Sequence, residues 1–305
     1  EIMPSLVGSE MCIRDRECAE RIRKYTNYIE KKKLEVATER QEELDSLNEM
    51  YCNVQQDIDT AMHFDRRLFE KTREDEDFLH IYLGQGTIAS SRPIDYKKQE
   101  RLEVGDELTE MPEKIYQLFE HIDGAPICSD MKDSNAIGIV GTKEALYGMF
   151  KNIVIDIAVR HYYGDVRLYM LVDDEKRYQW ARFLPHLMNA GGIRNIVFDN
   201  ESKNNIFESL FRELTYREQT EEIPYYGIVL VENEFGIKNH PISRYIEQAS
   251  ELGMTFVFFE NSAEELPLHC DEIIELHSES EGVICKACLL YTSEAADDTP
   301  CVDLG

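Results

Sequence analysis

The stretch Ala136-Ile-Gly-Ile-Val-Gly-Thr-Lys143 places a short apolar run directly before a glycine-containing turn and the start of a helical pattern. A buried strand that turns at once into a helix is the repeating unit of α/β folds. In open α/β sheets, ligands bind beyond the carboxyl ends of the strands. This stretch therefore predicts the fold class and also the place where a ligand site would lie.

The same alternation of strands and helices continues to about residue 287. The candidate strands are Ala136–Val140, Val166–Val172, Ile193–Phe198, Tyr226–Val231, Met254–Phe259 and Glu272–Leu276. Helical patterns separate them near residues 143–162, 176–189, 202–219 and 241–252. Nearly continuous apolar strands are typical of a parallel sheet with helices on both faces. We predict an α/β domain over residues 125–287.

The preceding part of the chain has a different residue pattern. Residues 17–83 contain no Gly and no Pro, and apolar residues recur there at intervals of three and four, as at Leu44, Leu47 and Tyr51. This spacing predicts a long amphipathic helix or helical pair over residues 17–72, a stalk with a coiled-coil-like seam that needs a partner. We interpret residues 73–124 as a linker region that contains a β-like stretch and a helix.

The two ends of the chain do not follow the sequence pattern of the interior. Residues 1–16 and 288–305 resemble translated sequencing-adapter sequence, and neither shows a sustained apolar period. Segments of this kind are set aside in fold reasoning. We therefore expect the protein proper to lie within residues 17–287.

The formal net charge of −27 bears on the class of partner. Binding to a phosphate backbone depends on Lys and Arg side chains that displace counterions, so nucleic acid is an improbable partner. Membrane spans need about 18 consecutive apolar residues, and the sequence has no such run. The eight cysteines show no disulfide framework, which suits a reducing cytoplasm.

A spacing reminiscent of zinc ligands occurs near the end of the chain. Cys285 and Cys288 are three residues apart, and His269 and Cys270 precede them. Because Cys288 falls in the suspect tail, at most three ligands remain for a site that needs four. We expect no metal.

The turn at Gly138–Lys143 occupies the position of a nucleotide-binding P-loop. A working P-loop needs G-x-x-x-x-G-K-[ST], whose N–H groups and lysine hold phosphates while its hydroxyl holds magnesium. Counted from Gly138, the motif would end in Lys143-Glu-Ala145, and counted from Gly141 it would end in Leu146-Tyr-Gly148. Both registers fail, which favours a tight turn without ligand. The degenerate positions at this turn are Gly138, Gly141, Thr142 and Lys143.

A second part of a nucleotide site would follow the strand Tyr226–Val231. There an acid would hold magnesium and the next residue would orient the attacking water. Glu232 stands where Asp is usual, and Asn233 stands where a catalytic acid is expected. Asp173 and Asp174 follow the strand 166–172 in a similar way. Without a P-loop lysine, we assign no catalytic residue, and we expect no cofactor, with ATP and Mg²⁺ as the alternative.

Several segments together resemble the type VII secretion ATPase family of the FtsK/SpoIIIE class, known as EssC in Firmicutes and EccC in actinobacteria. The matching segments occur in the family's order between about residues 60 and 285. They are Arg73-Glu-Asp-Glu-Asp-Phe-Leu79 with Leu83-Gly-Gln-Gly86, Ala125-Pro-Ile-Cys-Ser-Asp130, Ala136–Gly141, Trp180-Ala-Arg-Phe-Leu-Pro-His186, and Glu264-Glu-Leu-Pro267 with Cys270.

The resemblance implies a RecA-like, P-loop-NTPase-like fold and a place in a membrane-anchored secretion motor. The chain would be the membrane-proximal, degenerate ATPase-like module, with other domains and subunits of the motor as partners. It would lie at the cytoplasmic face of the bacterial membrane, in a homo-oligomer. Two alternatives stay open: an active ATP-binding ATPase or DNA translocase of the FtsK type, and a free-standing acidic interaction module.

Overall fold

The computed structural model describes residues 5–97, 107–189, 191–232, 236–266, 269–286 and 301–304. The chain divides into two compact units. The helical unit comprises Glu1–Met50 and Thr87–Ala125, and the sheet unit comprises Tyr51–Gly86 and Pro126–Gly305. Each unit is described by itself below.

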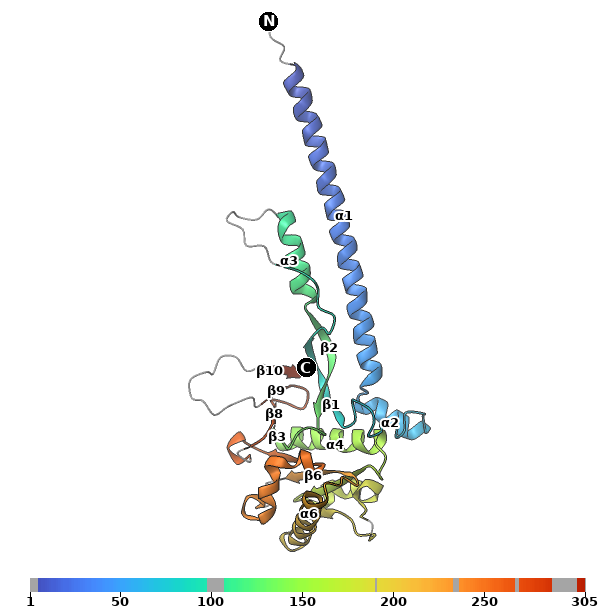
Figure 1. The fold of residues 1–305 in the computed structure, drawn as a ribbon, viewed down its shortest axis with the longest axis vertical. Helices are drawn as coiled ribbons and strands as arrows, with labels where there is room; N and C mark the ends of the chain where they lie inside the picture. Colours follow the sequence, from blue (N-terminus) through green and yellow to red (C-terminus); the bar gives the residue numbers. More distant parts are fainter. Residues whose placement is uncertain are drawn as a thin grey trace. The chain divides into compact units, whose positions relative to one another are not determined.

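The helical unit is built on α1, a helix of 46 residues from Ser5 to Met50. α3 (Glu107–Phe119) packs alongside it, as Figure 1 shows. A long helix is thus present, but it begins at Ser5 rather than at residue 17 and ends at Met50. Among the exposed large side chains of α1 are Ile22 and Tyr28.

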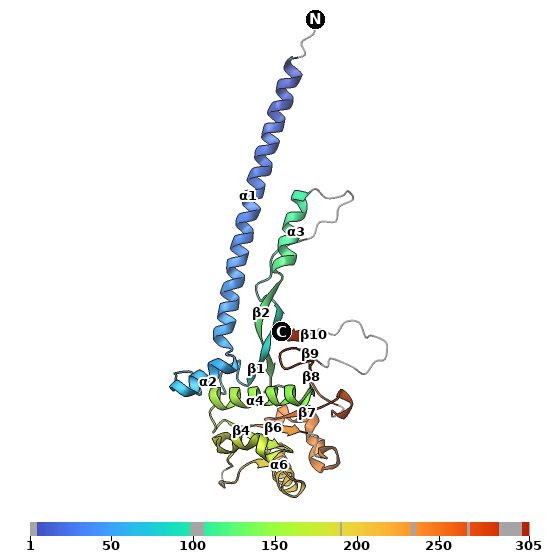
Figure 2. The ribbon, with the colours of Figure 1, turned by 180° about the vertical axis from the view of Figure 1, so that it is seen from behind.

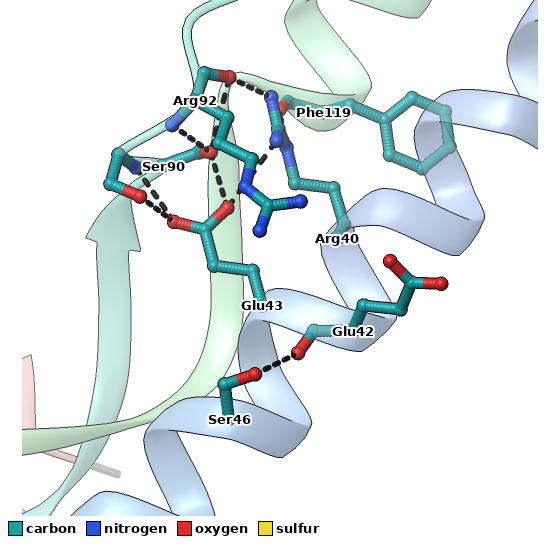
Figure 3. A network of polar contacts seen from close by, with 8 residues as sticks. Arg40, Glu42, Glu43, Ser46, Ser90, Arg92 and Phe119 are labelled. Carbon is teal, nitrogen blue, oxygen red and sulfur yellow. Dashed lines mark hydrogen bonds and ion pairs between the residues drawn. The ribbon is translucent and has the colours of Figure 1, made fainter.

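A buried ion pair fastens α1 within the helical unit. Arg40 Nη1 lies 3.4 Å from Glu43 Oε2, one turn further along the helix. The same guanidinium donates to two backbone oxygens, from Nε to Phe119 O and from Nη2 to Arg92 O, each at 2.8 Å (Figure 3). Arg40 therefore joins α1 to the end of α3 and to the segment that follows β1 (His80–Ala89).

Both oxygens of the Glu43 carboxylate also have hydrogen-bond donors. It accepts hydrogen bonds from Ser90 Oγ at 2.7 Å, from Ser91 N at 2.7 Å and from Ser91 Oγ at 2.6 Å. Burial raises the pKa of Glu43, but these hydrogen bonds outweigh burial, so the pKa lies below its ordinary value. Glu43 is therefore held as a charged group inside the helical unit.

The sheet that forms the core of the sheet unit is parallel over six strands, in the order β8-β3-β7-β6-β4-β5. These strands are β3 (Ala136–Gly141), β4 (Val166–Leu171), β5 (Ile196–Val197), β6 (Tyr226–Glu232), β7 (Met254–Glu260) and β8 (Glu272–Leu276). β9 (Gly282–Lys286) and β10 (Cys301–Leu304) add antiparallel strands beyond β8, followed by β1 (His80–Ala89) and β2 (His121–Asp130).

The helices of the sheet unit cover both faces of this sheet. α6 (Asn200–Thr220) contributes Phe207 and Leu210 to a buried cluster that includes Val229 of β6. On α4 (Lys143–Arg160), the Phe150 ring lies 5.0 Å from the ring of Phe259 of β7. α4 and α6 lie on opposite sides of the strands in both views (Figures 1 and 2). This arrangement confirms the predicted α/β fold and is consistent with the RecA-like class.

Two predicted helices are replaced by shorter pieces. The pattern near 176–189 folds as α5 (Glu175–Tyr178), η1 (Gln179–Phe183) and η2 (Pro185–Leu187). The residue before a proline disfavours helical backbone, and Leu184 is extended, with φ −66° and ψ 129°. The pattern near 241–252 folds as the 3₁₀ segments η4 (Pro241–Gln248) and η5 (Ser250–Leu252).

The remaining elements are α2 (Val54–His63), η3 (Ile237–Asn239) and η6 (Ala263–Glu265). α2 begins with a capping box in which Asn53 and Gln56 satisfy each other's backbone N–H groups. In the described part of the chain, no helix is both long enough and apolar enough to cross a bilayer.

Candidate functional site

The turn between β3 and α4 consists of a single residue, Thr142. Its backbone is extended, with φ −70° and ψ 154°, and its Oγ1 accepts the N–H of Ala145 at 3.4 Å. Its carbonyl accepts the N–H of Leu146 at 2.9 Å. Thr142 is thus an ordinary helix N-cap, and the chain has no loop here that could wrap around a phosphate.

The two glycines of β3 are explained by packing. A β-carbon at Gly138 would lie 2.6 Å from Leu266 Cδ1, and one at Gly141 would lie 2.9 Å from Leu276 Cβ and 3.0 Å from Leu276 O. Both contacts are closer than real β-carbons make. The glycines therefore let neighbouring segments approach the β3 backbone, which is a sufficient reason for their presence without a ligand.

Lys143 and Glu144 begin α4 with exposed side chains. Glu144 lies in the first turn, where its charge complements the positive end of the helix dipole. The Lys143 carbonyl accepts a hydrogen bond from Arg177 Nη2 at 2.9 Å. An anion at this helix end would meet Glu144 as well as the lysine.

Glu232 closes β6 and is held by neighbouring groups. Tyr178 donates its hydroxyl hydrogen to Glu232 Oε1, and the backbone N–H of Asp173 donates to Oε2 at 3.3 Å. Burial is the largest influence on this carboxyl and raises its pKa to about 7. Near neutrality Glu232 is therefore partly protonated, a poor state for a magnesium ligand. Asn233, the other predicted position after β6, lies outside the described residues.

Asp173 and Asp174 also end a strand, and one of them has a clear structural use. Asp174 Oδ1 accepts the N–H groups of Lys176 at 3.0 Å and Arg177 at 3.2 Å, which makes it the N-cap of α5. Its Oδ1 is therefore committed to the backbone of α5.

The structure brings the predicted positions to one edge of the sheet, with β7 between them. Val140 pairs with Glu260, and Glu232 pairs with Phe259. Glu260, which is 3% exposed, thus lies between the Thr142 turn and Glu232. Sequence reasoning missed this acid, although it directly follows the apolar run 254–259. Two acidic residues, Glu232 and Glu260, thus end adjacent strands at this edge of the sheet.

A cavity of about 570 Å³ adjoins the first turns of α4. Its walls come from α4, from the first half of β1 and from the turn between β8 and β9. They include Leu83, Glu144, Tyr147, Leu276, Glu279 and Glu281. Lys151 Nζ and the Arg177 guanidinium lie 4.6 and 4.2 Å from the centre of the Tyr147 ring. The cavity is therefore of mixed charge, with its cations already placed over an aromatic ring.

The Cys and His residues whose spacing resembles a zinc site do not come together among the described residues. Cys285 is on β9, where it pairs with Ile273, and Cys270 is buried before β8. Among described residues, the structure has no group of three or more His, Cys, Asp or Glu side chains arranged to hold a metal. Burial raises the pKa of Cys270 to about 12. Cys288 lies outside the described residues.

Comparison with known proteins supports the resemblance found in the sequence. No family model matches the chain. The type VII secretion system protein EssC of Staphylococcus aureus (strain MSSA476) is 28% identical over 283 residues, covering 88% of this chain and 19% of EssC. The ESX secretion system protein EccC of Geobacillus thermodenitrificans is 25% identical over 276 residues, covering 87% of this chain and 18% of EccC.

Among solved structures, EssC (ATPases 2 and 3) from Geobacillus thermodenitrificans aligns with 78% of this chain and 46% of that chain, with a TM-score of 0.49 and 12% identity. The chain spans about a fifth of the length of the curated relatives it matches. The predicted similarity to the EssC and EccC secretion proteins is confirmed.

Proposed function

We propose that this chain is a non-catalytic coupling and scaffold module of a membrane-anchored type VII secretion motor of the FtsK/SpoIIIE type. The observation that carries the non-catalytic part is the turn at Thr142, which connects β3 to α4 through one capping residue. Its relatives are named as type VII and ESX secretion system proteins, which supports a place in such a system.

The energetic argument starts from what triphosphate binding needs. A P-loop surrounds the phosphates with N–H groups and adds a lysine and a magnesium-binding hydroxyl. Here Thr142 caps the helix, Lys143 is exposed, and the exposed acid Glu144 beside it would repel phosphate. Each lost charge-assisted contact costs about 1.5–3 kcal/mol, and about 1.4 kcal/mol changes affinity tenfold. We infer that any binding of Mg-ATP is in the millimolar range.

The same proposal implies which partners the chain has and where in the cell it lies. Its partners are other domains and subunits of the motor, including further copies of itself, at the cytoplasmic face of the bacterial membrane. The net charge of −27 disfavours nucleic acid as a partner. The module needs neither ATP nor Mg²⁺ for its own role.

Titration calorimetry of the chain with Mg-ATP tests the proposal. We expect a dissociation constant near or above 1 mM, unchanged in Lys143→Ala. A low-micromolar constant that is lost in Lys143→Ala would instead support the alternative, an active ATP-binding FtsK-like ATPase. In that case the lysine must reach a phosphate from its exposed position at the start of α4.

A further inference from the structure

Helices α2 and α4 of the sheet unit pack together and bury an acidic side chain from each. Asp57 of α2 is 2% exposed, and Asp156 of α4 is 1% exposed. The two helices lie side by side in Figure 2. Two carboxyl groups are thus removed from water within one helix–helix interface.

These carboxyl groups are only partly satisfied. Asp156 Oδ2 accepts the backbone N–H of Tyr82 at 2.8 Å. Within the described part of the chain, Asp156 Oδ1 and Asp57 Oδ2 are buried and have no hydrogen-bond partner. A buried ionised carboxylate with an unmatched oxygen is costly, whereas a protonated one carries no net charge.

One guanidinium serves several acids in this cluster. The side chain of Arg160 is 3% exposed and donates from Nη2 to Glu70 Oε1 at 2.6 Å. The charges of Asp57 and Asp156 also act on it. Lys71, the other nearby amine, is paired with Asp77. Arg160 and Lys71 are therefore already engaged by carboxylates.

The groups around the two aspartates leave the cluster short of positive charge. The charged groups that act on the two aspartates are Arg67, Glu70, Lys71 and Arg160, and Asp77 belongs to the same cluster because it pairs with Lys71. The neighbouring titratable groups of the cluster are Cys52, Cys128 and His161. Burial raises the pKa of both thiols and lowers the pKa of His161 to about 3, so these three are neutral at pH 7. Four carboxyl groups then face three cations, and one proton would balance them.

We propose that Asp57 and Asp156 form a buried binding site for one proton, which holds α2 against α4. The proton lies on one of the two carboxyl groups while the other is ionised beside Arg160. Burial, followed by the charge of Asp156, raises the pKa of Asp57 to about 7. Burial likewise raises the pKa of Asp156, while the Tyr82 N–H and Arg160 oppose this effect by favouring its ionised form.

The sign of the resulting pH dependence follows from linkage. The folded state keeps a proton that a free aspartate, with a pKa of 3.8, releases. Between about pH 4 and pH 7 the folded interface therefore holds more protons than the separated helices do. The docking of α2 is strongest at the acidic end of this window and is lost as the pH rises, with a tenfold change in the opening equilibrium per pH unit for one proton.

Two measurements on the whole chain test the site. Carboxyl ¹³C NMR of aspartate-labelled protein should show one group of the pair that titrates near neutral pH. Amide hydrogen exchange of residues 54–63, corrected for intrinsic rates, should show opening that increases about tenfold per pH unit between pH 5 and pH 7. In Asp156→Asn, whose amide oxygen can still accept the Tyr82 N–H, this slope should disappear.

The matched control is Asp59→Asn on the same helix, because Asp59 is exposed. It should keep the wild-type slope. Asp57→Asn provides a second variant if Asp156→Asn does not fold. Normal, low titration of both carboxyl groups would overturn the proposal, as would an Asp156→Asn slope equal to that of Asp59→Asn. A hundredfold change in the opening equilibrium per pH unit would mean that two protons bind independently, and it would overturn the shared site.

Discussion

Arg40 and Glu43 form an ion pair of 3.4 Å on α1 in which each side chain is only 8% exposed. Their remaining polar atoms bond to the segment 90–92 and to the carbonyl of Phe119. A buried ion pair stabilises a protein only where such additional bonds complete the solvation of both charges. The pair is therefore best understood as the fastening point of the helical unit.

Arg40→Met should destabilise the helical unit by about 3–5 kcal/mol, because it leaves the Glu43 charge buried without its cation. Amide exchange of α3 during a urea titration would measure the loss. Lys32→Met is the matched control, since Lys32 and Glu35 form an exposed pair of 2.6 Å on the same helix with the same spacing. The control should change little, and equal effects of both variants would contradict the fastening role.

Acid should loosen the same unit. The pKa of Glu43 is lowered in the folded state, below a reference of 4.5. Its contribution to stability is therefore complete above about pH 4.5 and is lost as the pH falls through the lowered folded value. Glu43→Gln should remove this part of the acid dependence, which a series of melting curves from pH 3 to pH 6 would measure.

Gly141→Ala should destabilise the sheet unit by about 1–3 kcal/mol, because its methyl group would meet the Leu276 backbone. Gly148→Ala is a useful contrast: nothing lies within 4 Å of that β-carbon, and Gly148 is inside α4. There alanine should stabilise by about 0.5–1 kcal/mol. Urea unfolding measures both, and a harmless Gly141→Ala would show that the glycine is not there for packing.

The sequence was most informative where a strand is buried on both faces. The predicted strands Tyr226–Val231 and Met254–Phe259 have the same bounds as β6 and β7 to within one residue. An unbroken apolar run of this length is typical of a strand that is buried on both faces of a parallel sheet. The short strand β5 was predicted to be three times longer, since apolar composition alone does not show where pairing stops. The antiparallel strand β9 was not predicted.

The candidate site was predictable in position but not in detail. The turn at Gly141 follows from local sequence, whereas the reason for its glycine is contact with Leu276, 135 positions further along the chain. Tyr178 as the partner of Glu232, and Asp57 as the neighbour of Asp156, likewise depend on tertiary packing of distant segments. No spacing rule links such residues, so only the structure reveals them.

Glu232→Gln should stabilise the sheet unit at pH 8 by about 1–3 kcal/mol, allowing for screening of a partly exposed group. The folded pKa is about 7 against a reference of 4.5, so the folded state favours the protonated form, and the ionised form becomes costly as the pH rises through this window. The amide oxygen of glutamine can accept the hydrogen bond from the Tyr178 hydroxyl. Its NH₂ group cannot accept the backbone N–H of Asp173, so the loss of that 3.3 Å bond reduces the gain.

The stability difference from wild type should therefore be small near pH 4.5, grow up to pH 7 and then level off. Glu222→Gln is the control, because Glu222 is exposed shortly before β6, and it should show no such trend. Urea unfolding across pH 4–8 measures both variants. If Glu232→Gln instead destabilised the protein by an amount that grew as the pH rose above about 4, the folded state would favour the ionised carboxylate. That outcome would favour a magnesium ligand, and with it the active ATPase, over a coupling module.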